Sequence, residues 1–89
     1  MAFQSKDMSV LAYANGFTLW HYTTVDIATD VDTAGYFNTA ADMLRIGDMV
    51  FANVDTAGTP GAGIFLVNAN AAGVVDVADI TSIGSTDLD

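Results

Sequence analysis

The stretch FTLWHYTTV, residues Phe17–Val25, decides the fold. Most of its residues are aromatic or β-branched, a composition that favours a β-strand. Alternate side chains of a strand point to opposite faces, so Trp20 and Tyr22 share one face while Phe17 and His21 lie on the other. Because both faces carry large apolar groups, we expect both to be covered, one by the core of the domain and one by something else.

The Asn15–Gly16 pair directly before this strand is a strong signal for a tight turn. Residues 1–14 carry apolar side chains without a regular alternation. The sequence therefore predicts an N-terminal arm there, either an edge strand or an extended segment that reaches a neighbouring subunit. Residues 15–89 are expected to form a single β-rich domain, because a chain of 89 residues is sufficient for one core and not for two.

Further strands are expected after the central one, in segments rich in β-branched residues and bounded by turn residues. They are Asp48–Asp55, Gly63–Ala69 and Gly73–Ile80, the last two joined as a hairpin through Asn70–Ala72. Residues 81–89 predict a loose C-terminal tail. These elements predict a mainly β (α+β) fold, a small antiparallel sheet or barrel-like domain.

The segment from Thr33 to Arg45 has a helical period instead of an alternating one. Its apolar positions Phe37, Ala40, Ala41 and Leu44 follow the spacing i, i+3, i+4, i+7. We therefore expect a short amphipathic helix near residues 33–45. Asp32 or Thr33 would cap its start, and Gly47 follows its end.

The acidic stretch around Asp30 and Asp32 also resembles the first half of a calcium loop. An EF-hand loop needs oxygen ligands at its fifth and twelfth positions, where this sequence has Ala34 and Ala41. Helix capping therefore explains the two aspartates better, and no metal or other cofactor is expected. Weak calcium binding at Asp30 and Asp32, and with it a calcium-dependent adhesion module, stays an open alternative.

The charge and composition exclude several functions. The formal net charge is −9, which argues against direct binding of nucleic acid. The longest uncharged run is broken by Gly and Pro, so no membrane span is expected. The chain has no Cys, and its single histidine, His21, has no identifiable catalytic partner, so we expect no enzymatic activity. The N-terminus lacks the apolar centre of a signal peptide, which predicts synthesis in a cytoplasm.

The chain is 52% hydrophobic, which is more apolar surface than a small monomer easily hides. Self-association is therefore expected. The residues predicted to contact other subunits or a partner are Phe3, Met8, Leu11, Tyr13, Trp20 and Tyr22. For Trp20 and Tyr22, burial in the core of the domain is an equally good expectation.

Several short stretches resemble small structural virion proteins of tailed bacteriophages. They are Asn15–Tyr22, Gly35–Asn38, Asp42–Leu44, Gly47–Asp48 and Asn70–Val75. The resemblance spans about residues 9–80 and is to head components, namely decoration (cement) proteins or the capsid-binding part of a head fibre. It implies a non-enzymatic homotrimer that binds the phage major capsid protein. Such a protein is made in the cytoplasm of the bacterial host and resides on the capsid surface of the virion.

The acidity also suggests a different class of protein, a DNA mimic that inhibits a host nuclease or a CRISPR complex. Such a mimic needs carboxylates in rows, whereas these aspartates are scattered at turns and strand ends. The salt dependence of binding separates the two functions, because ionic strength weakens a mimic steeply and leaves apolar contacts in place.

Overall fold

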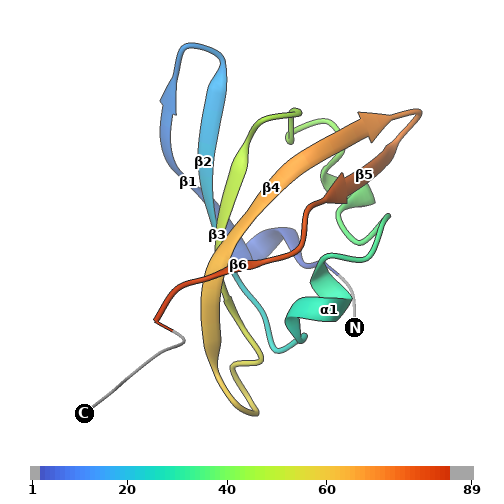
Figure 1. The fold of residues 1–89 in the computed structure, drawn as a ribbon. Helices are drawn as coiled ribbons and strands as arrows, with labels where there is room; N and C mark the ends of the chain where they lie inside the picture. Colours follow the sequence, from blue (N-terminus) through green and yellow to red (C-terminus); the bar gives the residue numbers. More distant parts are fainter. Residues whose placement is uncertain (1–2, 85–89) are drawn as a thin grey trace.

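The computed structural model describes residues 3–84, which form one sheet and a few short helical turns (Figure 1). The strands are β1 (Met8–Ala14), β2 (Phe17–Thr23), β3 (Met49–Val54), β4 (Gly61–Ala71), β5 (Val74–Val77) and β6 (Thr81–Ser82). The helical elements are the 3₁₀ turns η1 (Ser5–Asp7) and η2 (Asn38–Ala40) and the helix α1 (Ala28–Val31). The mainly β fold with one short helix, predicted from the sequence, is thereby confirmed.

The strands lie in the order β1-β2-β3-β4-β5, and β6 also pairs with β4. All pairs are antiparallel except β2 and β3, which run parallel. The antiparallel pairing expected from the sequence therefore holds for every pair except this central one. Parallel neighbours need a crossover connection, and residues 24–48 supply it by carrying the chain from the end of β2 back to the start of β3.

The first hairpin has the predicted turn. Asn15 and Gly16 both have positive φ, 54° and 88°, as the mirror-image turn of a two-residue hairpin requires. Residues 8–14 pair along β2 up to this turn, so the greater part of the predicted arm is an edge strand of the chain's own sheet. A register shift between Val10 and Ala12 leaves Leu11 without a partner residue on β2, which is the pattern of a β-bulge.

The second hairpin turns later than predicted. Asn70 and Ala71, which the sequence placed in the turn, still belong to β4 and pair with Val75 and Val74. The side-chain amide of Asn70 donates to two backbone carbonyls of the crossover segment, at 2.8 and 2.6 Å, and this fixes the end of β4. The turn itself consists of Ala72 and Gly73, both with positive φ.

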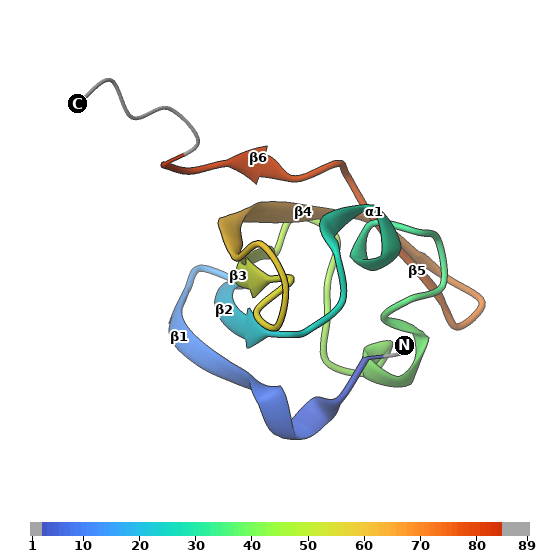
Figure 2. The same cartoon turned by 90° about the horizontal axis from the view of Figure 1, so that it is seen from below.

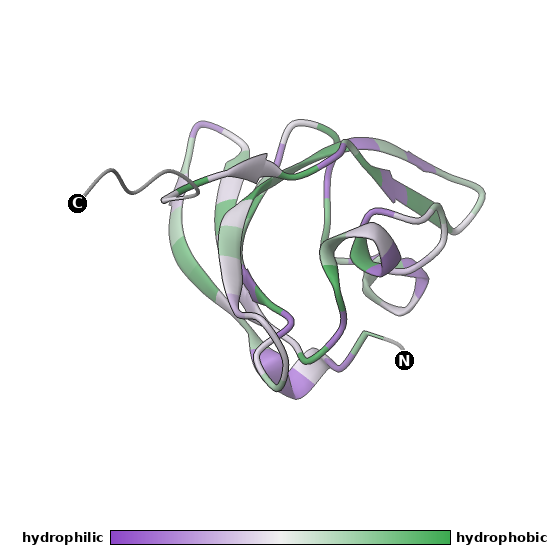
Figure 3. Ribbon diagram, turned by 60° about the horizontal axis from the view of Figure 1, so that its bottom comes forward, coloured by the Kyte–Doolittle hydropathy of each residue, from purple (hydrophilic) through white to green (hydrophobic). Residues whose placement is uncertain are grey.

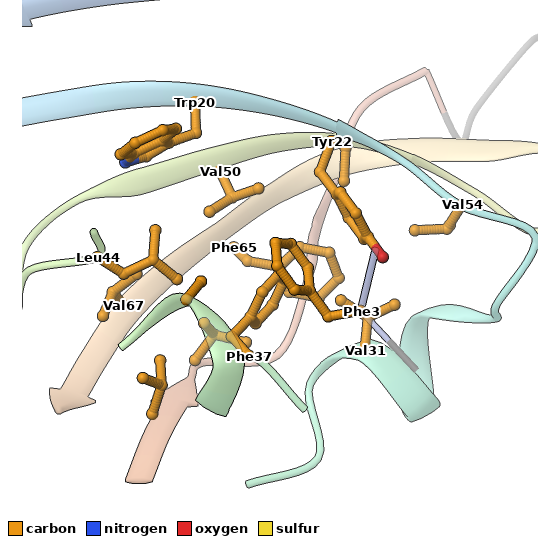
Figure 4. Packing of buried hydrophobic residues seen from close by; sticks show 14 residues of the cluster. Phe3, Trp20, Tyr22, Val31, Phe37, Leu44, Val50, Val54, Phe65 and Val67 are labelled. Atoms are coloured by element: carbon orange, nitrogen blue, oxygen red, sulfur yellow. The ribbon is translucent and has the colours of Figure 1, made fainter. Parts of the chain in front are cut away.

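The sheet curves around the crossover segment, which covers its concave face (Figures 2 and 3). Alternation along β3 sets the two faces, because Val50, Ala52 and Val54 are buried while Met49 and Asn53 are exposed. The buried side chains of the sheet meet Val31, Phe37, Ala40 and Leu44 of the crossover segment in a single core (Figure 4).

The predicted helix near residues 33–45 is wrong in geometry and right in burial. The helix α1 ends at Val31 with Asp32 as its C-cap, so Asp32 follows a helix and neither it nor Thr33 starts one. Gly35 then adopts φ +92° and donates its N–H to the carbonyl of Val75 on β5. This long-range bond and the positive φ interrupt an α-helix, and i to i+3 turns follow.

The apolar positions of that segment nevertheless face the core as the spacing predicts. Phe37, Ala40 and Leu44 are buried, and Asn38 and Asp42 are exposed. A succession of tight turns has a period near three residues, close enough to the helical one to keep the same side inward over two turns.

The predicted loose tail is wrong for Thr81 and Ser82, which pair with Ile64 and Gly63 of β4. The N–H of Ile83 continues this pairing by donating to the carbonyl of Ala62 at 3.0 Å. The last part of the predicted tail, residues 85–89, lies outside the described residues.

Candidate interaction surface

Three of the residues predicted to contact partners are buried in the chain's own core. Tyr22 is 0% exposed, and Phe3 and Trp20 are also buried. The ring of Phe3 lies 5.2 Å from that of Tyr22 and 5.3 Å from that of Phe37, so the N-terminal segment closes over the core (Figure 4). The prediction that these three side chains face a partner is therefore corrected, because the crossover segment covers the face of β2 that carries Trp20 and Tyr22.

A buried carboxylate holds the start of the sheet together. Asp48 is 0% exposed. Its Oδ1 accepts the backbone N–H of Thr18 at 3.0 Å, and its Oδ2 accepts the indole Nε1–H of Trp20 at 3.2 Å and the backbone N–H of Arg45 at 3.1 Å. One side chain thus fastens β2 to the turn that begins β3. The sequence placed Asp48 only at a strand end, because two of its three partners, Thr18 and Trp20, are 30 and 28 positions away.

A chain of hydroxyl groups ties the other end of β2 to the crossover segment. The Tyr36 hydroxyl donates to Asp26 Oδ2 at 2.7 Å, so in its 2.8 Å contact with the Tyr22 hydroxyl it accepts. The Tyr22 hydroxyl in turn accepts the backbone N–H of Gln4 at 3.3 Å. Burial raises the pKa of Tyr36, as do its bonds to Tyr22 and Asp26, while a contact with Thr24 opposes the shift. These groups are all engaged with one another and act as structural links.

The convex face of the sheet carries a group of apolar side chains that stay partly or largely exposed in the described chain. Leu19, Met49 and Leu66 form one row across β2, β3 and β4, and Phe51 and Ile64 stand beside one another in the next row. We call these residues, together with Phe17, the outer face. Phe17, Leu66 and Met49 expose 56%, 44% and 39% of their surface. We expected both faces of β2 to be covered. The core covers the face with Trp20 and Tyr22, and the face with Phe17 stays exposed in this chain.

A shallow hollow lies at one end of the outer face, with a volume of about 220 Å³. Residues at its wall include Tyr13, Phe17 and Met49. Ligand pockets for small molecules usually measure about 300–1,000 Å³ and carry a few polar groups that orient the ligand. This smaller and apolar hollow suits a single side chain of a partner better than a substrate.

The remaining predicted contact residues lie on β1, the strand at the edge of the sheet. Leu11 is 56% exposed and Tyr13 is 63% exposed, while Met8 is half-buried against the core. Val10, which the sequence analysis did not single out for contact, is exposed to a similar extent. The structure therefore places Leu11 and Tyr13 together on a free strand edge and separates them from Phe3, Trp20 and Tyr22.

The negative charge lies away from these surfaces. Residues 8–25 contain no Asp, Glu, Lys or Arg. Asp30, Asp32, Asp76 and Asp79 gather instead where α1 approaches β5. Burial raises the pKa of Asp32, and the carboxyl groups of Asp79, Asp76 and Asp30 raise it further. The repulsion within this group shows that it is a crowded acidic surface.

The groups considered for chemistry, His21 and the aspartates near Asp30, lie within residues 3–84. No group of three or more His, Cys, Asp or Glu side chains is placed there to hold a metal ion, including the surroundings of Asp30 and Asp32. His21 Nε2 lies 2.9 Å from Asn53 Oδ1 on the exposed side of the sheet, a polar pair between neighbouring strands. No helix in the described part of the chain is long and apolar enough to span a membrane.

Comparison with known proteins gave no match. No family model, no curated protein and no solved structure is significantly similar to this chain. Inferences about its function therefore depend on the surfaces described above and on the resemblance in its sequence.

Proposed function

We propose that this chain is a non-enzymatic structural protein of a tailed phage virion, most specifically a capsid decoration protein that oligomerises and stabilises the head. The observation that carries the proposal is the outer face, a broad uncharged apolar surface on a chain whose formal net charge is −9. The short stretches that resemble phage head proteins supply the setting. The surface supplies the physical reason, since an apolar patch of this kind marks a site of protein association.

An exposed apolar face suits docking on a protein shell. A partner that covers Phe17, Met49 and Leu66 would remove their side chains from water, which favours association roughly in proportion to the area buried. A protein that binds only the assembled shell also stabilises that shell by mass action. No chemical step is needed for this role.

The acidic inhibitor of a nuclease or CRISPR complex is less well supported. The carboxyl groups of Asp26 and Asp48 are buried and accept hydrogen bonds within the chain, so neither can stand in for a DNA phosphate. The exposed apolar surfaces that favour binding to a partner lie on β1 and on the outer face, and neither carries the carboxylates that a DNA mimic would use.

Cosedimentation with phage heads tests the proposal. Heads of the phage that carries the gene, prepared without this protein, are mixed with wild type, with Met49→Asp and with Met43→Asp. The two methionines are 39% and 41% exposed, but only Met49 lies on the outer face, so the pair is matched for the change made and for its exposure. We expect binding by wild type and Met43→Asp at both low and high salt, and loss of binding by Met49→Asp.

Absence of wild-type binding to the heads, or equal binding by the two variants, would count against the proposal. Binding to a host nuclease that disappears at high salt and is displaced by duplex DNA would favour the inhibitor instead.

A further inference from the structure

The open edge of β1 is a second surface, distinct from the outer face. Its far side carries no strand among the described residues, because β1 stands at the end of the sheet order (Figure 1). Every residue from Ser9 to Ala14 is exposed. In an antiparallel pair alternate residues point their N–H and C=O groups away from the partner, so β1 presents a row of free backbone donors and acceptors on that side.

Proteins usually protect such an edge with Lys, Pro or an inward-pointing charge. Residues 8–14 contain none of these, and the Lys6 and Asp7 side chains lie before the strand. The bulge at Leu11 twists the edge locally, but it leaves an exposed leucine at the middle of the strand. The edge is therefore more suited to pairing than to remaining in water.

We propose that a second copy of this chain occupies the edge, pairing β1 with β1 in antiparallel fashion about a two-fold axis that passes beside Leu11. This inference rests on the proposed function for the self-associating role and names the surface that serves it. An antiparallel strand pair is its own complement under a two-fold rotation, so one edge suffices for both partners. The axis falls beside Leu11 because Leu11 is the central residue of β1, and centring gives the longest overlap of the two strands.

Charge favours a second copy at this place over most others. Each chain carries a formal net charge of −9, so two copies repel one another wherever aspartates meet. The stretch from Met8 to Val25 is free of charged residues and forms the whole β1–β2 hairpin. Contact along this hairpin keeps the aspartates of the two chains apart.

The apolar area on the edge is consistent with a reversible contact. A large aromatic side chain covers roughly 200 Å², so Tyr13 at 63% exposure still has about 120 Å² to bury. Val10 and Leu11 add roughly 50 Å² each, given their exposures of 55% and 56% and the usual 60–120 Å² of such side chains. The sum is near a quarter of the roughly 800 Å² per partner in a stable complex. The backbone and the rest of the hairpin add to it, and we expect a dimer whose fraction rises with protein concentration.

Cysteine cross-linking tests the contact directly, because the chain has no cysteine of its own. Two Leu11 residues beside a two-fold axis lie within the roughly 4.4–6.8 Å between Cα atoms that a disulfide requires. With copper phenanthroline and air as the oxidant, we expect Leu11→Cys to give a disulfide-linked dimer. The matched control is Val74→Cys, which is 47% exposed on β5 and should give no disulfide-linked dimer at the same concentration.

A charge-exchange experiment tests whether the partner is a copy of the same chain. Leu11→Asp alone and Leu11→Lys alone place like charges across the axis, and each should give a monomer by light scattering. A mixture of the two variants should recover the dimer, because the charges are then opposite. Unchanged urea midpoints for both variants would establish that each is folded.

Three results would overturn the inference. The first is the absence of a Leu11→Cys cross-link, and the second is equal cross-linking of the two cysteine variants. The third is a trimer whose mass is the same for wild type, Leu11→Asp and Leu11→Lys. None of them argues against the proposed function, because attachment to phage heads is measured separately by cosedimentation of the Met49→Asp variant. Conversely, a Leu11-dependent dimer that does not bind phage heads would support the edge contact and contradict the proposed function.

Discussion

Replacing Asp48 by Asn is expected to lower the free energy of unfolding by about 2–4 kcal/mol. The carboxylate accepts three N–H donors, one on Oδ1 and two on Oδ2. An amide keeps one acceptor oxygen and puts an NH₂ group in place of the other. In either orientation that NH₂ faces an N–H, so at least the Thr18 N–H or the pair from Trp20 and Arg45 loses its acceptor.

The magnitude follows from the contacts. A buried donor left without a partner costs about 1–3 kcal/mol, and bonds that were made to a charged group weaken from about 1.5–3 to about 0.5–1.5 kcal/mol. Asp48 is 0% exposed, so water offers the orphaned donor no replacement. For a domain of this size each kcal/mol corresponds to about 4–8 °C in Tm, which puts the expected decrease at about 8–32 °C.

Urea unfolding followed by the fluorescence of Trp20 and by far-ultraviolet circular dichroism measures the effect. Trp20 is the only tryptophan, and it touches the mutated side chain, so the second probe is needed to separate a change in brightness from a change in stability. The matched control is Asp42→Asn, an identical change at an exposed position, expected to stay within about 0.5 kcal/mol of wild type.

The reasoning is refuted if Asp48→Asn and Asp42→Asn unfold at the same urea concentration with the same slope. A double-mutant cycle with Trp20→Phe adds a finer check. Because the indole donates to Asp48, we expect the two substitutions to couple by about 0.5–3 kcal/mol, read by circular dichroism. Strict additivity would mean that this bond contributes nothing to stability.

Two further predictions concern ionisation. The raised pKa of Asp32 means that the folded state holds its proton more tightly, so this group favours folding at low pH and loses that contribution as pH rises through the raised pKa. Asp32→Asn should therefore stabilise the protein by a few tenths of a kcal/mol at pH 7, a figure reduced for screening, and give no gain near pH 3; destabilisation at pH 7 would contradict this. The pKa of Tyr36 is likewise raised above its ordinary 10.0, so its contribution is present below pH 10 and lost at higher pH. Tyr36→Phe should cost about 1–2 kcal/mol at pH 7 and should remove the alkaline loss, which urea titrations at pH 7 and pH 11 measure; an unchanged alkaline loss would contradict the assignment.

The strands were predictable because their signal is local. Alternation along Phe17–Val25 set the two faces of β2 correctly, and the Asn15–Gly16 pair set the first turn. The buried positions Phe37, Ala40 and Leu44 were also correct, although the backbone there is not an α-helix. Side-chain periodicity reports which residues face inward, and it reports the hydrogen-bonding pattern of the backbone less directly.

The errors arose where distant residues decide the local structure. The parallel pairing of β2 with β3 joins segments thirty positions apart, and no turn signal between neighbours could show it. The bond from Gly35 N–H to the Val75 carbonyl, which interrupts a helix in the crossover segment, also joins residues far apart in the sequence. The role of Asp48 was missed because an aspartate before a strand looks like an ordinary turn residue until its three partners are brought to it.

The candidate contact residues divide into a buried pair and an exposed pair, and the sequence alone could not separate them. Trp20 and Tyr22 are large aromatic residues on a strand, equally fit for a core or an interface, and their place depends on which face of β2 the crossover covers. Leu11 and Tyr13 lie past the reach of that cover, on the edge strand. Only the topology of the whole chain distinguishes the two pairs.

The parallel pair at the centre of the sheet also sets the order in which the strands can pair during synthesis on the ribosome. β1 and β2 are synthesised first and can close their hairpin, but β2 then waits for β3, which lies beyond the crossover. At about 5–20 residues per second, the intervening segment takes a few seconds to emerge. Before the crossover and β3 have emerged, Tyr22 has no Phe37 and Trp20 has no Val50 to pack against. The nascent hairpin is thus exposed on both faces at once, and it is the segment that a chaperone would bind first.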